Sequence, residues 1–254
     1  MAFIQMNFFS GVLGMGVPVN VILPEKIRNT ADNTVKTLYL LHGLTDDHTA
    51  WMRQTSIERY ANEYGIAVVM PEVHRSWYTD TADNARYLSY VAEELPRACR
   101  GFFRGLSDKR EDNMIAGLSM GGYGAMKIAL RYPDTFGGCA ALSGALDIAD
   151  LARRFDLGEW RGIFGFDLDS AAQLKGSRHD VFHIVRSHSE SGGAFPRLYL
   201  WCGEQDRLIE CNGRMHELLD SLGVEHIYEH SEGNHSWKWW DLHIQSALGY
   251  LLGK

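Results

Sequence analysis

Three residues of this chain carry the side chains that acyl transfer needs, in the order serine, aspartate, histidine. Ser119, Asp206 and His235 each follow an apolar run with the length of a β-strand. A serine hydroxyl is a weak nucleophile near neutral pH, and an imidazole with a pKa of about 6.5 can take its proton. A carboxylate on the other ring nitrogen orients the imidazole and offsets its charge. The pattern predicts Ser119 as the nucleophile, His235 as the general base and Asp206 as the acid.

The proposed nucleophile stands at the centre of a Gly-x-Ser-x-Gly sequence, residues 117–121. It follows the apolar run 114–116 and precedes a helical segment at 122–131. A turn this tight between strand and helix leaves no room for side chains beside the serine. It also places the hydroxyl at a helix N-terminus, where N–H groups favour negative charge. This setting favours a nucleophile over a serine in an ordinary turn.

Two other carboxylates compete with Asp206 for the role of the acid. Asp147 follows the preceding strand, and Glu204 lies two residues upstream. Asp206 is preferred because Gly203 ends the strand and leaves this carboxylate in the loop that follows.

Two other histidines compete with His235 for the role of the base. His226 and His230 fall within or at the end of a predicted strand. His235 instead lies among the turn residues 231–236, just before the last predicted helix. A loop position after a strand favours His235.

The oxyanion of a tetrahedral intermediate needs backbone N–H donors. With a nucleophile elbow, one donor is the residue after the serine, here Met120, and the other comes from the loop after a central strand. The run 34–41 becomes increasingly apolar before the loop 42–46, so Leu44 is the predicted second donor. His42 is expected to support this loop and to perform no chemistry.

An aromatic and charged loop at 72–80 follows the predicted strand 66–70. If it leaves the same edge of the sheet, Trp77 and Tyr78 would wall an acyl or alcohol pocket. Large aromatic side chains also commonly cover a core, which is the alternative interpretation. Trp237, close to His235, is the third candidate for contact with substrate.

Strands and helices alternate along most of the chain, which predicts a mostly parallel sheet covered by helices on both faces. The first two strands are separated by a short turn and are expected to form an antiparallel hairpin at one edge. Pro96 is expected to interrupt the long helix. The predicted strands are 2–9, 17–23, 34–41, 66–70, 112–116, 135–144, 197–203 and 224–229, and the helices are 54–64, 87–103, 122–131, 210–222 and one after 235.

About fifty residues, 145–195, separate two predicted core strands, which is too long for a plain connection. Amphipathic pieces at 147–155 and 177–187 indicate an inserted helical, lid-like segment. Its place after the elbow helix would let it cover Ser119.

The insert contains three histidines, and the first two have the i, i+4 spacing of a helix. Two histidines without a third ligand or a recognised frame are a weak signal for a metal. We therefore expect His179, His183 and His188 to be solvated surface residues, with no metal bound.

Length and charge limit the function classes. The chain has 254 residues, with 25 Lys and Arg against 32 Asp and Glu, a net charge of −7. We expect one domain over 1–254, no nucleic-acid partner and no anionic membrane partner. The N-terminal residues lack the features of a secretory signal, and no apolar run approaches the length of a membrane span. The sequence predicts a soluble, cytoplasmic protein.

The four cysteines are spread without the C-x-x-C spacing of a zinc or redox site. Buried free thiols are the favoured interpretation, with a bridge between Cys202 and Cys211 as the alternative.

These motifs together resemble one known group of enzymes. The sequences at 42–44, 117–125, 203–206 and 234–237 are similar to the tributyrin esterase branch of the esterase D / S-formylglutathione hydrolase group of α/β-hydrolases. The resemblance covers nearly the whole chain and is weakest at 145–195. It implies the α/β-hydrolase fold, with a mostly parallel central sheet, helices on both faces and a small helical insert.

The resemblance also implies an activity. It indicates a serine carboxylesterase that hydrolyses short-chain acyl esters through an acyl-enzyme intermediate, without a metal or other cofactor. It assigns the same triad, the oxyanion donors Leu44 and Met120, and a small-molecule ester as the partner. Members of the group commonly form dimers or tetramers, so a homo-oligomer is expected.

Other substrates stay open at this point. S-formylglutathione hydrolases usually carry a cysteine shortly after the Gly-Leu-Thr of the oxyanion loop, where this chain has Asp46 and Asp47. Related enzymes remove acetyl or feruloyl groups, and an aromatic pair at Trp77 and Tyr78 would suit a flat phenolic acyl group. The alternatives are a thioesterase, an acetyl or feruloyl esterase, an acyltransferase, and a hydrolase-fold binding module without catalysis.

Overall fold

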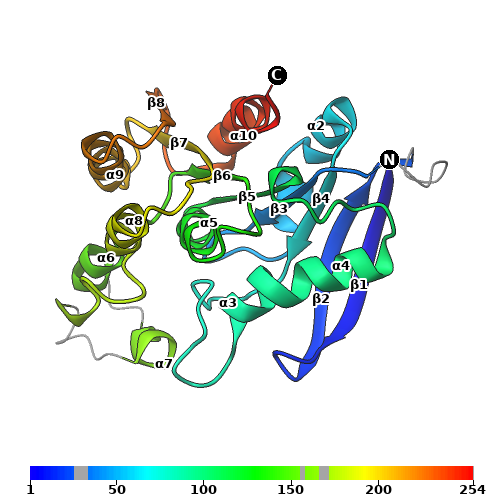
Figure 1. Cartoon of the computed structure of the whole chain (residues 1–254), viewed down its shortest axis with the longest axis horizontal. Helices are drawn as coiled ribbons and strands as arrows, with labels where there is room; N and C mark the ends of the chain where they lie inside the picture. The colour runs from blue at the N-terminus through cyan, green and yellow to red at the C-terminus, as the bar shows by residue number, and fades with distance from the viewer. Residues whose placement is uncertain (26–33, 155–157, 166–171, 254) are drawn as a thin grey trace.

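The computed structural model describes residues 1–25, 34–154, 158–165 and 172–253. Within these ranges, eight strands form one sheet in the order β1-β2-β4-β3-β5-β6-β7-β8 (Figure 1). The strands are β1 (Ala2–Ser10), β2 (Met15–Leu23), β3 (Thr37–Leu41), β4 (Ala67–Pro71), β5 (Asn113–Leu118), β6 (Gly138–Leu142), β7 (Arg197–Gly203) and β8 (His226–Ser231).

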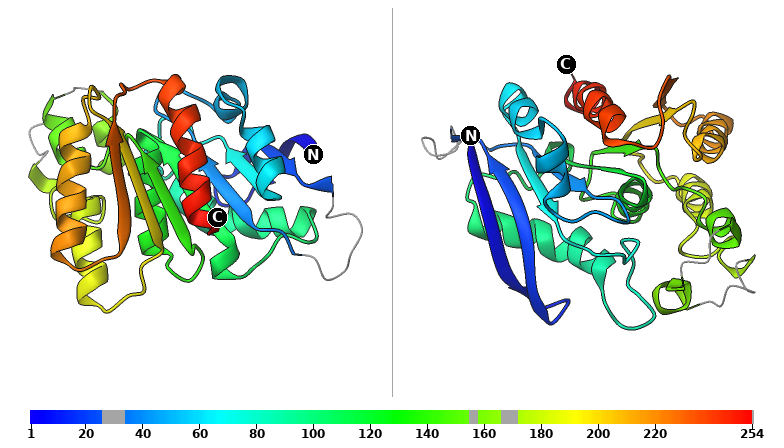
Figure 2. Two further views of the ribbon diagram at one scale, coloured as in Figure 1. Left: turned by 90° about the horizontal axis from the view of Figure 1, so that it is seen from above. Right: turned by 180° about the vertical axis from the view of Figure 1, so that it is seen from behind.

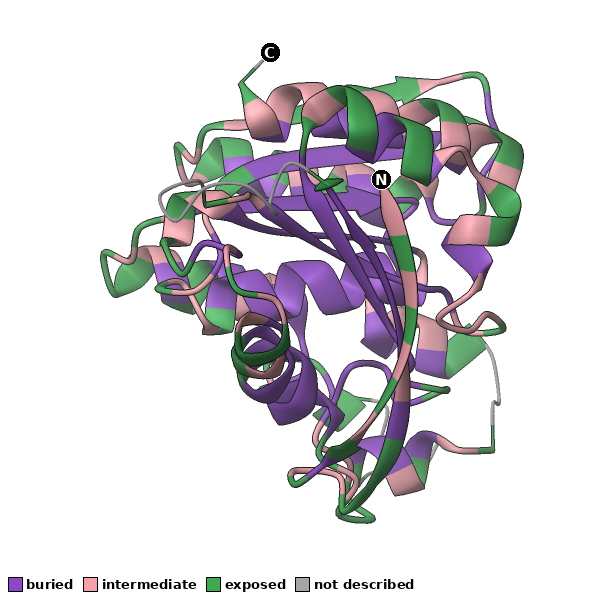
Figure 3. Cartoon of the chain, turned by 90° about the vertical axis from the view of Figure 1, so that its right-hand side faces the viewer, coloured by how far each residue is buried: buried purple, intermediate pink, exposed green. Residues whose placement is uncertain are grey.

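Six of these strands are parallel. β1 and β2 form an antiparallel hairpin, and β2 joins the rest by antiparallel pairing with β4. From β4 to β8 every neighbouring pair is parallel. Every residue of β3, β4, β5 and β6 is buried, because helices cover both faces and apolar runs can then occupy both sides (Figure 3). The predicted mostly parallel sheet with an edge hairpin is confirmed.

Helices pack on both faces of the sheet (Figure 2). One apolar layer is completed by α1, α2 and α10, and the other by α3, α4, α5, α8 and α9. The helices are α1 (Ala50–Gln54), α2 (Ile57–Tyr64), α3 (Tyr87–Ser89), the π-helix η2 (Tyr90–Glu94), α4 (Leu95–Phe102), the 3₁₀-helix η3 (Arg110–Asp112), α5 (Met120–Arg131), α6 (Ile148–Arg154), α7 (Trp160–Phe164), α8 (Val181–Glu190), α9 (Ile209–Ser221) and α10 (Trp237–Leu252).

The structure corrects two helix predictions. The predicted helix 54–64 is α2, which begins only at Ile57, because the Ser56 N–H donates to the Asp241 carboxylate of α10 at 3.0 Å and lies outside the helical ladder; Gln54 belongs to the separate helix α1. Helical backbone runs from α3 through η2 into α4, so Pro96 does not interrupt it. The wider π-turn directly before Pro96 accommodates a ring that would clash with a regular α-helix.

The segment 145–195 joins β6 to β7, and its described part contains α6, α7 and α8. In Figure 1 these helices lie together at one side of the molecule, next to α5 and α9. No helix in the described ranges is long and apolar enough to cross a membrane. All four cysteines are buried free thiols, so the alternative bridge between Cys202 and Cys211 is not formed.

Candidate active site

Ser119 sits in the turn between β5 and α5 with φ 52° and ψ −116°, a backbone conformation that few non-glycine residues adopt. The flanking glycines make this turn feasible. A Cβ on Gly117 would lie 2.4 Å from the carbonyl carbon of Gly121, and one on Gly121 would lie 2.5 Å from the Leu41 carbonyl oxygen. The elbow therefore packs backbone against backbone and directs the serine away from the sheet.

The structure brings the three predicted triad residues together. His235 Nε2 lies 3.0 Å from Ser119 Oγ, and His235 Nδ1 lies 2.8 Å from Asp206 Oδ2. An ionised carboxylate can only accept, so Nδ1 carries the proton and Nε2 is free to accept from the serine hydroxyl. This is the arrangement in which an imidazole can act as general base toward serine.

Asp206 is buried and fully engaged. Burial alone would raise the pKa of this carboxyl, but hydrogen bonding to His235 and the nearby imidazole outweigh that effect and hold the pKa below its usual value. The Leu208 N–H also donates to Asp206 Oδ1 at 2.9 Å. Asp206 therefore stays negative at neutral pH and offsets a positive charge that develops on His235.

Backbone hydrogen bonds join the loop after β7 to the loop after β8. The Glu204 N–H donates to the Ser231 carbonyl and the Gln205 N–H to the Gly233 carbonyl, both at 2.8 Å. The Gln205 side chain accepts from the Gly233 N–H at 2.8 Å. The loops that carry the acid and the base are thus held in one relative position.

The competing carboxylates and histidines have other partners. Asp147 pairs with Arg214 at 2.7 Å, and Glu204 pairs with His230 at 3.2 Å. His226, at the first residue of β8, contacts a histidine of α9. None of these side chains has a hydrogen bond to the nucleophile within the described residues.

Both predicted oxyanion donors lie near Ser119, since Met120 follows it in the chain and Leu44 lines the same cavity. Met120 is the first residue of α5, where backbone N–H groups have no partner within the helix. Leu44 follows β3 in a tight loop, in which the Asp46 carboxylate accepts from the Gly43 N–H at 3.1 Å. Within the described part of the chain, the N–H groups of Leu44 and Met120 donate no hydrogen bond. Both are free to bind a negatively charged oxygen.

His42 supports this oxyanion loop, as predicted. Its Nδ1 lies 2.8 Å from the Gly43 carbonyl oxygen, and its Nε2 accepts from the Val73 N–H at 3.2 Å. A neutral ring protonated on Nδ1 satisfies both contacts. The Tyr78 hydroxyl donates to the His42 carbonyl at 2.9 Å. Backbone groups therefore bond both ring nitrogens, which suits a supporting role.

A cavity of about 490 Å³ opens above the serine hydroxyl. One wall is formed by Leu44, Asp46 and other residues of the oxyanion loop, and another by Leu151 of α6 and Trp160 of α7. The remaining apolar lining is Trp77, Leu118, Ala145, Leu208, Trp237 and Trp240. A pocket of this size, apolar apart from a few polar groups, fits a small organic ligand.

Trp77 and Tyr78 have different positions, although they are neighbours of similar chemistry. Trp77 lines the cavity and contacts the Trp160 ring, with centroids 5.2 Å apart. Tyr78 is fully buried and packs against the elbow helix, where a Cβ on Gly124 would lie 2.4 Å from its ring. The prediction that Tyr78 walls the pocket is wrong, because its hydroxyl is committed to the oxyanion loop.

Comparison with known proteins identifies the family. The family model described as "Putative esterase" matches residues 10–251. The chain belongs to this esterase family. The chain is 33% identical to the acetyl esterase of Caldicellulosiruptor saccharolyticus, over 99% of its own length and 98% of that enzyme.

Two solved structures from Staphylococcus aureus are also similar to the esterase. The fluorophosphonate-binding serine hydrolase FphF gives a TM-score of 0.91 at 35% identity, covering 100% of this chain and 99% of that one. The S-formylglutathione hydrolase FrmB gives a TM-score of 0.89 at 35% identity, covering 99% and 98%. The protein is a serine esterase of the esterase D/S-formylglutathione hydrolase-like α/β-hydrolases, and its reaction class is carboxylic ester hydrolysis.

The histidines of the insert differ from the expectation. His183 is exposed, but His179 and His188 are buried, at 3% and 8% exposure. His179 precedes α8, so it shares no helical face with His183, and it packs on the Phe164 ring. Burial, together with the nearby positive charge of Lys127, lowers its pKa to about 3, so it is a neutral core residue of the esterase.

Sequence reasoning missed two groups of supporting residues. Leu151 and Trp160 enter the cavity from the insert, and the only available signal was the amphipathic pattern of that segment. The second group centres on Glu72, which accepts from the His48 and His74 N–H groups at 3.1 and 2.7 Å. This carboxylate ties the loop after β3 to the loop after β4.

Proposed function

We propose that the esterase hydrolyses short-chain acyl esters through an acyl-enzyme intermediate on Ser119, as in the tributyrin esterase branch of its group. The observation that carries this proposal is the position of His235, in hydrogen-bond contact with both Ser119 and Asp206 at the base of the cavity. A reactive hydroxyl, a base and an oriented acid in one pocket are the requirements for acyl transfer.

The geometry suggests the following course. His235 takes the proton as Ser119 Oγ attacks the ester carbonyl, and the Leu44 and Met120 N–H groups bind the resulting oxyanion. His235 then gives its proton to the departing alkoxide, and the acyl group remains on the serine. In the second half, His235 removes a proton from water, the water oxygen attacks the acyl carbonyl, and the serine leaves with the proton returned.

The cavity walls support a small acyl group. Trp77 and Trp160 contact one another where they line the pocket, and Leu151 belongs to the same lining. A relative that is an acetyl esterase matches over the whole chain. We propose that acetyl to butyryl esters fit and that longer chains meet this aromatic wall.

A thioester substrate is the second candidate, because the S-formylglutathione hydrolase FrmB has the same fold at 35% identity over nearly the full length. In this chain the cavity lining includes the Asp46 carboxylate, which accepts from the Gly43 N–H, and the Arg207 guanidinium. We propose that a neutral ester is favoured, because the Asp46 charge opposes an anionic thiol carrier; turnover of S-formylglutathione tests whether Arg207 offsets that charge.

The test is a rate profile with p-nitrophenyl esters from acetate to decanoate, with methyl ferulate and S-formylglutathione beside them. We expect rates to peak at short chains and to fall by at least about 10⁴-fold in Ser119→Ala, as for loss of a serine nucleophile elsewhere. Ser236→Ala is a matched control, because this serine also lines the cavity but its hydroxyl donates to Asn234 and not to a triad residue. A Ser119→Ala protein with wild-type rates would overturn the proposal.

A fluorophosphonate probe separates the chemistry from the substrate class. We expect the wild type and Ser236→Ala to be labelled and Ser119→Ala to stay unlabelled. Labelling without turnover of short esters, but with turnover of the ferulate or the thioester, would retain the nucleophile and replace the substrate.

The proposal extends to the organisation of the protein. We propose one domain over 1–254, in which the segment 145–195 forms a lid over Ser119, and a cytoplasmic homo-oligomer, either a dimer or a tetramer. Its support is the placement of Leu151 and Trp160 in the cavity wall and the resemblance to the group. Light scattering of the purified chain measures the assembly, and a monomer at micromolar concentration would contradict it.

A further inference from the structure

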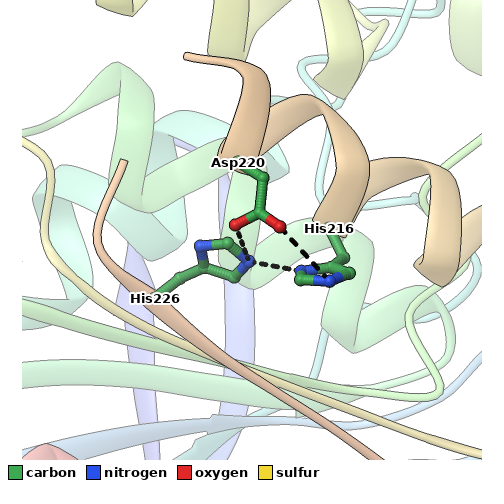
Figure 4. Close-up of side chains that lie close together, drawn as sticks. All are labelled: His216, Asp220 and His226. Carbon is green, nitrogen blue, oxygen red and sulfur yellow. Dashed lines mark hydrogen bonds and ion pairs between the residues drawn. The ribbon is translucent and has the colours of Figure 1, made fainter. Parts of the chain in front are cut away.

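Two histidines and an aspartate meet at the outer edge of the sheet, where no part of the esterase mechanism uses them. His216 and Asp220 are four residues apart on α9, so they share one face of that helix. The chain reverses at Gly223, which has φ 67°, and His226 begins the edge strand β8 directly beside them. Figure 4 shows the three side chains pointing toward one another.

The ligand atoms of this cluster are close together. His216 Nδ1 lies 2.8 Å from His226 Nε2, and Asp220 lies 3.4 Å from His216 Nε2 and 3.9 Å from His226 Nε2. One ligand atom from each residue can be chosen so that all three lie within 4.8 Å. Three donors at this spacing can reach a common centre.

The rings are held in orientations that suit a metal. His226 Nδ1 lies 2.8 Å from the Val224 carbonyl oxygen, which can only accept, so the proton is on Nδ1 and the Nε2 lone pair faces the cluster. Metal-binding histidines are commonly oriented by this type of backbone contact. His216 stacks on the Tyr228 ring, with centroids 4.8 Å apart and planes at 29°. These contacts bring the two rings close together and orient His226 before any ion arrives.

We propose that His216, Asp220 and His226 form a binding site for a divalent transition-metal ion of the Zn²⁺ type. A set of two imidazoles and one carboxylate binds such ions in preference to Mg²⁺ or Ca²⁺, which favour oxygen ligands. Asp220 and His216 are partly open to solvent, with side chains 62% and 36% exposed, so water can complete the coordination.

The required movement is small. In a tetrahedral zinc site with bonds of about 2.0–2.1 Å, two ligand nitrogens lie about 3.3 Å apart. The 2.8 Å contact between the two imidazoles has to open by about half an ångström, and His216 can rotate because it faces solvent on one side. The ion would join the end of α9 to the start of β8 and would stabilise the short connection between them.

The experiment uses the full-length chain without an affinity tag, freed of metal by a chelator and dialysed. Zn²⁺ is titrated by isothermal calorimetry, and Co²⁺ is added separately because its visible absorption reports the ligand geometry. We expect one ion per chain at this site. Loss of a group that only supports a metal ligand weakens metal binding by roughly 10–100-fold. His216→Ala and Asp220→Asn remove a ligand itself, so each should raise the Kd for Zn²⁺ by more than that. Each should also abolish the Co²⁺ absorption bands.

His230→Ala is the matched control, because His230 also lies on β8 and pairs with a carboxylate, Glu204, at 3.2 Å, but belongs to no three-ligand cluster among the described residues. It should bind Zn²⁺ like the wild type. The proposal would be overturned if the wild type showed no saturable Zn²⁺ binding, or if Asp220→Asn and His216→Ala bound Zn²⁺ as tightly as the wild type. It would also be overturned if binding were lost in His230→Ala or His235→Ala and kept in those two variants.

Discussion

Two buried carboxylates near the carboxyl ends of the strands contact imidazole rings, and only one of them has the geometry for chemistry. Asp206 orients His235, whose second nitrogen faces the hydroxyl of Ser119 at 3.0 Å. Glu72 lies beside His42 and His48, at 3.4 and 3.1 Å. Carboxylate and imidazole are shared by both sites, so the residue types do not make the difference.

The difference lies in what occupies the other ring nitrogen. Both nitrogens of His42 are committed to backbone, one to the Gly43 carbonyl and one to the Val73 N–H. An imidazole with both nitrogens bound to backbone cannot shuttle a proton, whereas His235 has one nitrogen directed at a side-chain hydroxyl. The Glu72 site therefore holds loops, whereas the Asp206 site has the geometry that the proposed proton transfer needs.

Of the variants at these two carboxylate sites, Asp206→Asn should have the largest effect on kcat, because it removes the carboxylate that orients His235. The amide keeps the shape but turns a donor toward His235 Nδ1, so the ring adopts the wrong tautomer. We expect kcat for p-nitrophenyl acetate to fall by about 10⁴-fold, as in the corresponding change in serine proteases. The midpoint of urea unfolding should shift little, and a kcat close to wild type would contradict the assignment.

The next largest effect should come from Glu72→Gln, which removes the carboxylate that holds the loops after β3 and β4 together and should lower the stability. The carboxylate accepts from two backbone N–H groups and from the His48 imidazole, and an amide can satisfy only part of that set. We expect a loss of about 2 kcal/mol in the free energy of unfolding at pH 7, measured with urea. The kcat of the folded variant should fall far less than that of Asp206→Asn.

The pH dependence of this loss sharpens the comparison. Burial would raise the pKa of Glu72, but the contacts to His42 and His48 and the His74 N–H hold it well below its usual 4.5. The stabilisation is present above pH 4.5 and is lost as the pH falls below that value. The difference in unfolding free energy between wild type and Glu72→Gln should therefore shrink from pH 7 to pH 3, and a constant difference would contradict this account.

The smallest effect on stability and kcat should come from Tyr78→Phe, which removes a hydroxyl group that supports the oxyanion loop. The hydroxyl donates to the His42 carbonyl, so its loss leaves that oxygen without this donor. We expect a loss of about 1 kcal/mol in stability and a small decrease in kcat with KM unchanged. Tyr250→Phe, on the surface helix α10, is the control and should change neither quantity.

The positions of the chemistry-bearing residues could be predicted because they depend on local patterns. Each of Ser119, Asp206 and His235 follows an apolar strand, and the carboxyl ends of parallel strands meet at one edge of the sheet. The glycines at 117 and 121 could likewise be interpreted from the elbow sequence, since backbone packing leaves no alternative residue there.

The roles of the supporting residues could not be predicted, because they depend on backbone conformations that no pattern reports. Trp77 and Tyr78 both have positive φ, 52° and 48°, and this turn directs one ring into the cavity and the next into the core. Glu72 and the buried His179 are polar residues that each have a partner distant in sequence, His48 and Phe164 respectively. Hydrophobic periodicity identifies elements, but it does not identify which neighbour a polar side chain will meet.

The pairing of β6 with β7 has a consequence for the evolution of this fold. The two strands are bonded to each other from Gly138 with Arg197 to Leu142 with Trp201, so their spacing is fixed by the sheet and not by the fifty residues that join them. Those residues supply Leu151 and Trp160 to the cavity, whereas the proposed reactive groups come from other loops. Insertions, deletions and exchanges in that segment can change which acyl groups are accepted while the reaction itself is inherited unchanged.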